Sequence, residues 1–93
     1  MEIEVRIEYV EMGWAISKKF QLAAVPSIGT MITTTAAGNW VEVDSVYLNL
    51  DTNVPTLFAK GDGNVIRSFY HEGGWQVVDD PHGVAERELA DPQ

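Results

Sequence analysis

Apolar and polar residues alternate strictly along the first nine positions of this chain, and this pattern limits the possible folds more than any other feature. An alternation of period two places one set of side chains on each face of a β-strand. Residues 14–22 resume the alternation after Met12 and Gly13, so we expect a hairpin that turns there. Lys18 falls on the inner face and indicates a snorkelling side chain or a bend. The residues predicted to face the core are Ile3, Val5, Ile7, Tyr9, Trp14, Ile16, Phe20 and Leu22.

A rigid bend follows the hairpin at Pro26 and Gly29. Proline lacks the N–H group that a central strand donates, and glycine adopts the positive φ that other residues resist. We interpret residues 25–29 as the corner at which the sheet folds over. A β-branched side chain at Gly29 is therefore expected to lower stability before it affects any function.

Five further segments have strand patterns and are separated by turns rich in Gly, Pro, Asn and Asp. The longest, residues 40–50, changes phase at Asp44 and Ser45, as a strand does at a β-bulge. We predict an all-β fold, nearly without helix: a small, strongly bent antiparallel barrel of the SH3-like kind with about six or seven strands. An open β-sandwich is the second choice. The other predicted strands are residues 30–35, 56–60, 65–70 and 75–79.

The chain length of 93 residues suits one domain, which we place at residues 1–80. The composition shifts after Asp80, and residues 81–93 are predicted to be a C-terminal tail. Residues 84–90 within it are expected to form one or two helical turns, or to fray unless Val84 and Leu89 dock on the body.

Composition excludes several classes of chemistry. The sequence has no cysteine, which rules out disulfides, thiolate nucleophiles and cysteine-ligated metals. It has no apolar run of signal-peptide or membrane-spanning length, so we expect a cytoplasmic protein with no membrane partner. Fourteen acidic and six basic residues give a net charge of −8, which opposes direct binding to nucleic acid. The charge serves solubility, or it forms an acidic surface that meets a basic partner.

No catalytic motif is present, so the chain is predicted not to be an enzyme and to need no cofactor. Its serines lie outside any Gly-x-Ser-x-Gly elbow, and no phosphate-binding loop or dinucleotide fingerprint occurs. One cluster has metal-ligand character, and its members are either exposed hairpin and tail residues or part of a site. In the second case the protein is a small metal-dependent hydrolase that uses His71 with Asp79 or His82. The cluster consists of His71, Glu72, Asp79, Asp80 and His82.

The candidate binding residues are three tryptophans and two carboxylates. Each tryptophan stands beside a Gly-containing turn, and it either fills the core or helps to frame a binding surface. The two carboxylates share one face of the long strand at 40–50 and extend the acidic face of the first strand. These carboxylates form a solvated strand face, a general acid, or a stripe that mimics nucleic acid. The binding residues are Trp14, Trp40, Trp75, Glu42 and Asp44, and the stripe adds Glu2, Glu4 and Glu8.

One segment resembles a known pattern. Residues 22–32 read LAAVPSIGTMI and lead to the strand at 41–50. This arrangement resembles short uncharacterised bacterial and phage proteins in which an apolar strand runs through Pro-x-x-Gly-Asp into a small β-barrel. The similarity covers residues 3–50, with Thr30 where Asp is usual. It implies the fold and an origin like that of mobile gene cassettes, and it implies no activity or binding residue.

These observations favour a non-catalytic protein-interaction module that binds a protein partner. A homodimer formed through an exposed strand is one expected form of that binding. The alternatives are an acidic, nucleic-acid-mimicking inhibitor of a basic partner and the small hydrolase described above.

Overall fold

The computed structural model describes residues 1–90, and it folds them into seven strands and two helices. Residues 91–93 of the predicted tail lie outside the described part. The elements in chain order are β1 (Glu2–Tyr9), β2 (Trp14–Gln21), β3 (Met31–Thr33), β4 (Trp40–Glu42), β5 (Ser45–Leu48), β6 (Pro55–Lys60), α1 (Gly63–Tyr70), β7 (Gln76–Val78) and α2 (Val84–Ala90).

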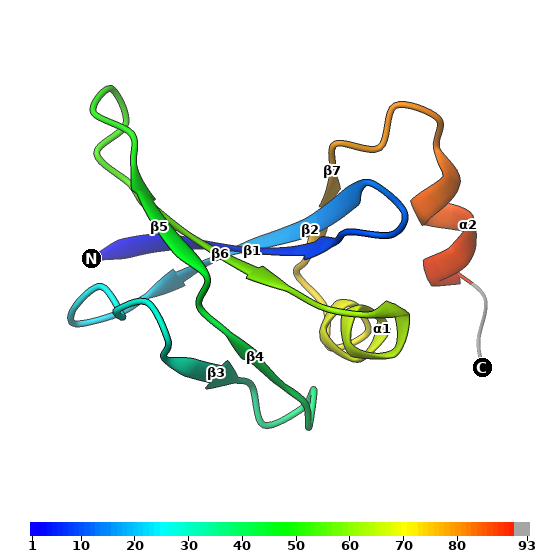
Figure 1. Cartoon of the computed structure of the whole chain (residues 1–93), viewed down its shortest axis with the longest axis horizontal. Helices are drawn as coiled ribbons and strands as arrows, with labels where there is room; N and C mark the ends of the chain where they lie inside the picture. Colours follow the sequence, from blue (N-terminus) through cyan, green and yellow to red (C-terminus); the bar gives the residue numbers. More distant parts are fainter. Residues whose placement is uncertain (91–93) are drawn as a thin grey trace.

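Five strands form one sheet in the order β5-β6-β1-β2-β7, and β3 pairs with β4 in a second, small sheet (Figure 1). The predicted hairpin is confirmed, because β1 and β2 pair antiparallel with Ile7 opposite Ile16. The mostly-β class is confirmed as well. The prediction of a purely antiparallel arrangement is wrong, since β6 runs parallel to β1 with Leu57 opposite Val5. Among residues 1–90 the strands do not close into a barrel.

The predicted strand at 65–70 is wrong, and so is the near absence of helix, because this segment lies in α1. The Asp62 carboxylate accepts a hydrogen bond of 2.9 Å from the Val65 N–H and caps the helix. Ile66 and Phe69, three positions apart, lie on the buried face. The apolar residues of this segment therefore follow the helical period, and the cap selects the helix over a strand.

The prediction of one bulged strand over residues 40–50 is wrong, because the phase change marks the place where the chain leaves the small sheet after β4 and enters the five-stranded sheet at β5. Val41 and Val43 are buried on the β4 side, whereas Val46 pairs with Leu57 in the five-stranded sheet. The corner at residues 25–29 and the residue after it are hydrogen-bonded to Val43, where the phase changes. The Gly29 N–H donates to the Val43 carbonyl at 2.8 Å, and the Val43 N–H donates to the Thr30 carbonyl at 2.8 Å.

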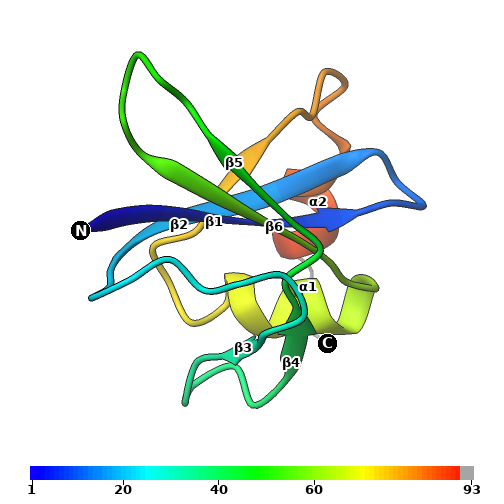
Figure 2. The same ribbon diagram turned by 60° about the vertical axis from the view of Figure 1, so that its left-hand side comes forward.

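One face of the five-stranded sheet carries the core. α1 and the β3–β4 pair lie on the same side of this sheet (Figure 2), and α2 lies beyond β7 at one end (Figure 1). The opposite face carries the polar residues of β1, as the alternation predicts. The core consists of Ile3, Val5, Ile7, Trp14, Ile16, Ala37, Val41, Val43, Leu57, Ala59, Ile66, Phe69, Trp75, Ala85 and Leu89.

The residues after Asp80 form the helical turns that were one of the two expectations for the tail. Asp80 accepts hydrogen bonds from the N–H groups of Val84 and Ala85 at 3.1 and 2.9 Å. Ala85 and Leu89 are buried in the core, and the Leu89 carbonyl bonds His71 Nε2 at 2.8 Å. Docking of Leu89 thus supplies the contact that a helix this short needs.

The Gly29→Val substitution is expected to destabilise the protein by about 1–3 kcal/mol, because Gly29 has φ +90° and a β-branched residue is strained there. Urea unfolding measures the change. Gly29→Asn is the matched control and is expected to lose less, since Asn tolerates a positive φ better than Val. An unchanged unfolding free energy for Gly29→Val would show that the corner is not a constrained element.

Candidate functional site

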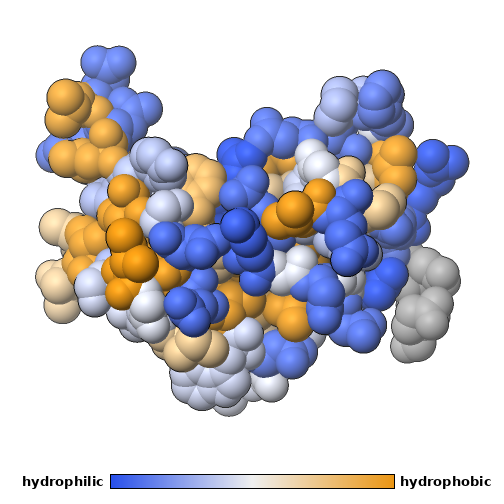
Figure 3. Space-filling model, in the orientation of Figure 1, coloured by the Kyte–Doolittle hydropathy of each residue, from blue (hydrophilic) through white to orange (hydrophobic). Residues whose placement is uncertain are grey.

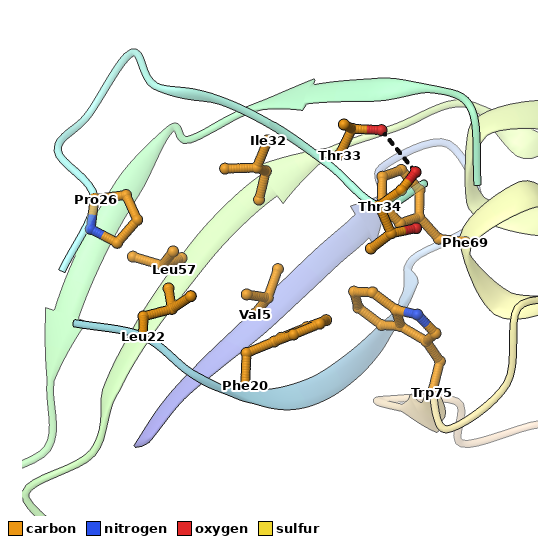
Figure 4. Close-up of a pocket in the computed structure, with 10 residues that line it drawn as sticks. All are labelled: Val5, Phe20, Leu22, Pro26, Ile32, Thr33, Thr34, Leu57, Phe69 and Trp75. Carbon is orange, nitrogen blue, oxygen red and sulfur yellow. Dashed lines mark hydrogen bonds between the residues drawn. The ribbon is translucent and has the colours of Figure 1, made fainter. Parts of the chain in front are cut away.

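A small apolar cavity of about 120 Å³ lies between the five-stranded sheet and the chain segment that includes β3. Figure 4 shows that Val5 on β1, Phe20 on β2 and Leu57 on β6 line the cavity from three adjacent strands of the large sheet. Ile32 faces them from β3. Val5 and Leu57 at the floor are buried, whereas Leu22, Pro26 and Ile32 at the rim are half-buried, so the cavity opens at the surface. The complete lining is Val5, Phe20, Leu22, Pro26, Ile32, Thr33, Thr34, Leu57, Phe69 and Trp75.

Three aromatic rings close one end of this cavity. The Trp75 ring lies 5.8 Å from that of Phe20 and 5.6 Å from that of Phe69, and both pairs are edge-to-face. This arrangement places the positive ring edge against the negative ring face, which favours the geometry beyond simple burial. The three rings therefore form the aromatic wall of the cavity.

A buried carboxylate stands behind the aromatic wall. The Glu72 side chain is 7% exposed, and it accepts hydrogen bonds from the Thr34 hydroxyl and, at 2.6 Å, from Trp75 Nε1. The Lys18 ammonium lies 3.9 Å from Glu72 Oε1 and donates to the Gly73 carbonyl at 3.0 Å. Lys18 thus snorkels from the inner face, and its charge partly balances the carboxylate. This network ties β2, the segment after β3 and the turn after α1 together.

The outer edge of the sheet presents a second candidate surface. β5 is an edge strand, and large apolar side chains near it are open to solvent. Tyr47 is 60% exposed, Leu48 55% and Leu50 84%. Figure 3 shows hydrophobic residues gathered on the side of the molecule that holds β5 and the loop after it, beside a hydrophilic middle. A cluster of exposed apolar residues along an edge is a feature of interaction surfaces.

The three tryptophans do not frame one surface. Trp14 and Trp75 are buried, whereas Trp40 on β4 is 60% exposed. Trp14 packs edge-to-face on Tyr9 with the ring centroids 5.3 Å apart. Of the three, Trp75 lines the cavity and Trp40 lies on the exposed face of the small sheet. The sequence pattern finds these residues near turns but does not separate core from surface.

The predicted acidic stripe is divided between two sheets. Glu42 is exposed on β4, opposite Met31, whereas Glu4 lies on β1 with Lys19 opposite. Asp44 follows β4 and pairs with Lys60 at 3.5 Å. Basic side chains therefore stand among the carboxylates of the larger sheet, and the five predicted members do not form one continuous row.

The predicted metal cluster is also dispersed among other interactions. His71 bonds the Leu89 carbonyl, Asp79 pairs with Arg6, and Asp80 caps α2. Glu72 belongs to the network beside the cavity, and His82 is exposed. Within residues 1–90 no three His, Asp or Glu side chains are placed to hold one metal ion.

Sequence reasoning missed the cavity and the role of Glu72. The cavity is formed by residues from distant parts of the chain, such as Leu22, Ile32 and Phe69, so no local motif encodes it. A weak signal existed for the network, because Lys18 on an apolar strand face requires a polar partner. That signal points to a carboxylate without saying which one.

The chain matches no family model, no curated protein and no solved structure. The described part of the chain contains no helix that is long and apolar enough to cross a membrane.

The Glu72→Ala substitution is expected to destabilise the protein by about 2–3 kcal/mol, since it leaves the Trp75 N–H and the Thr34 hydroxyl without their acceptor. Urea unfolding measures the change, and the Trp75 indole N–H resonance is expected to shift. Lys18→Met is the comparison, with a smaller loss because Lys18 is 29% exposed and its contact is long. Equal losses for both variants would contradict a network centred on Glu72.

Proposed function

We propose that this protein is a non-catalytic protein-binding module that associates with a second copy of itself through β5. The observation that carries the proposal is the outer edge of β5, which no other strand of residues 1–90 pairs, together with the exposed side chains of Tyr47 and Leu48 on β5 and of Leu50 after it. An edge strand with unpaired N–H and C=O groups is a template for pairing with another strand.

The two edges of the sheet differ in how well they resist such pairing. β5 reads Ser-Val-Tyr-Leu and carries neither charge nor proline, in a chain whose net charge is −8. The other edge, β7, has three residues and is followed directly by Asp79 and Asp80. Charged side chains and short length usually protect an edge strand against pairing with another chain, and β5 carries no charged side chain. β5 is therefore the edge that we expect to pair.

A second copy fits this edge by symmetry. Antiparallel pairing of two β5 strands about a two-fold axis at Tyr47 keeps the same faces together and sets Val46 against Leu48 of the second copy. Asp44 then falls near Leu50 of the second copy, so no carboxylate of this segment opposes another. The paired strands would extend each five-stranded sheet into one of ten.

Charge separates this proposal from the acidic inhibitor. Two copies that each carry a net charge of −8 repel one another, and salt screens that repulsion. An acidic surface on a basic partner is instead held by attraction, which salt weakens.

Self-association is expected to strengthen when NaCl is raised from about 50 mM to about 500 mM, because screening removes repulsion while apolar contacts persist. Sedimentation velocity over a concentration series measures the dimer fraction. A dimer that dissociates with added salt, or a monomer at every concentration, would contradict the proposal.

Leu48→Lys is expected to weaken dimer formation by at least about tenfold, because it buries a charge twice in the symmetric interface. Met31→Lys is the matched control: Met31 is 51% exposed on the small sheet, and the substitution adds the same charge. Sedimentation of both variants at the same salt concentration makes the comparison. If Met31→Lys dissociates the dimer and Leu48→Lys does not, the interface lies on the β3–β4 face instead.

A further inference from the structure

We propose that the cavity beside β3 is a binding site for a small, uncharged, apolar ligand of about the size of one aromatic ring. The inference does not depend on self-association, since the residues that line the cavity are distinct from those of β5. Size, polarity and ring geometry each support it.

The volume fits one ring. Dry apolar cavities of about 150 Å³ take up benzene or xenon, and this cavity measures about 120 Å³. Pockets for larger cofactors and drug-like molecules start at roughly 300 Å³. The half-buried rim, which includes Leu22, Pro26 and Ile32, gives a ligand a path from solvent to the buried floor at Val5 and Leu57.

The polar groups of the lining already have partners. The Thr34 hydroxyl donates to Glu72 and accepts from the Ala37 N–H at 3.2 Å. The Thr33 hydroxyl donates to the Asn39 carbonyl and also lies 3.2 Å from the Thr34 carbonyl, a contact drawn in Figure 4. A charged or strongly polar ligand would lose its hydration here and find few free partners. The lining therefore selects for uncharged, apolar chemistry.

Ring geometry favours an aromatic occupant. Phe20, Phe69 and Trp75 already pack edge-to-face at the closed end. A further ring can continue the same pattern of edges against faces, which contributes beyond the burial of its area. A branched hydrocarbon fills the same volume without that contribution.

Benzene is the probe for this site, and a two-dimensional ¹H–¹⁵N NMR titration of the full chain is the readout. The three tryptophans give three indole N–H signals, of which the one from Trp75 is expected to shift and saturate. Trp14 and Trp40 do not line the cavity and serve as internal controls. Intermolecular NOEs from benzene to the methyl groups of Val5 and Leu57 are expected as well. Benzoate, the same ring with a carboxylate, is expected to give no saturable shift.

Ile32→Phe is expected to fill the cavity and weaken benzene binding by at least about tenfold, whereas Ile28→Phe is expected to leave it unchanged. Ile28 makes the matched control, because it lies four positions before Ile32 in the loop that leads into β3, is 66% exposed and does not line the cavity. Leu22→Phe, at the half-buried rim, replaces Ile32→Phe if that variant does not fold. The proposal is overturned if benzene gives no saturable shift of Trp75, if Ile28→Phe and the filling variant bind it equally, or if benzoate binds as well as benzene.

Discussion

The pairing of β6 with β1 is the contact on which the rest of the structure depends. β1 is the middle strand of five, and its inner residues Ile3, Val5 and Ile7 are nearly or fully buried. Parallel pairing places Leu57 and Ala59 beside them and directs the chain after β6 into α1, which covers the same face. β2 ends and β6 begins at the same end of β1 but on its opposite sides, and the chain between them makes a long excursion as it crosses from one side of β1 to the other. That excursion forms β3, β4 and β5.

The excursion also explains the cavity. β3 and β4 reach the core face through Ile32 and Val41, but they are short and pair mainly with each other. Their position against β6 is fixed by the Asp44 N–H, which donates to the Phe58 carbonyl at 2.7 Å, and their position against the turn after α1 by the Thr34–Glu72 contact. Between these two anchors the side chains do not fill the space, and about 120 Å³ stays open. Because hydrogen bonds hold the β3–β4 segment at both ends of the cavity, this segment does not move inward to fill the space.

The two candidate surfaces have different physical origins. The β5 edge arises from topology, since the outermost strand of an open sheet has unpaired backbone groups on one side. The cavity arises from packing between layers that come from distant parts of the chain. An interface at β5 would bury the exposed Leu48, and none of the residues that line the cavity belongs to β5. Pairing between copies and binding of a small ligand are therefore compatible in one molecule.

The sequence by itself determined the hairpin of β1 and β2, the corner at Gly29 and the phase change at Asp44, because alternation, turn residues and backbone strain act over a few neighbouring positions. The prediction of a strand at 65–70 is wrong because Ile66 and Phe69 follow the helical spacing behind the Asp62 cap of α1. Only the tertiary structure decided that β6 runs parallel to β1, that Trp14 and Trp75 are buried while Trp40 is exposed, and that Glu72 joins Thr34 and Lys18. Those outcomes depend on contacts between residues far apart in the chain. A pattern of period two shows which face of a strand is buried, but it does not show which other elements cover that face.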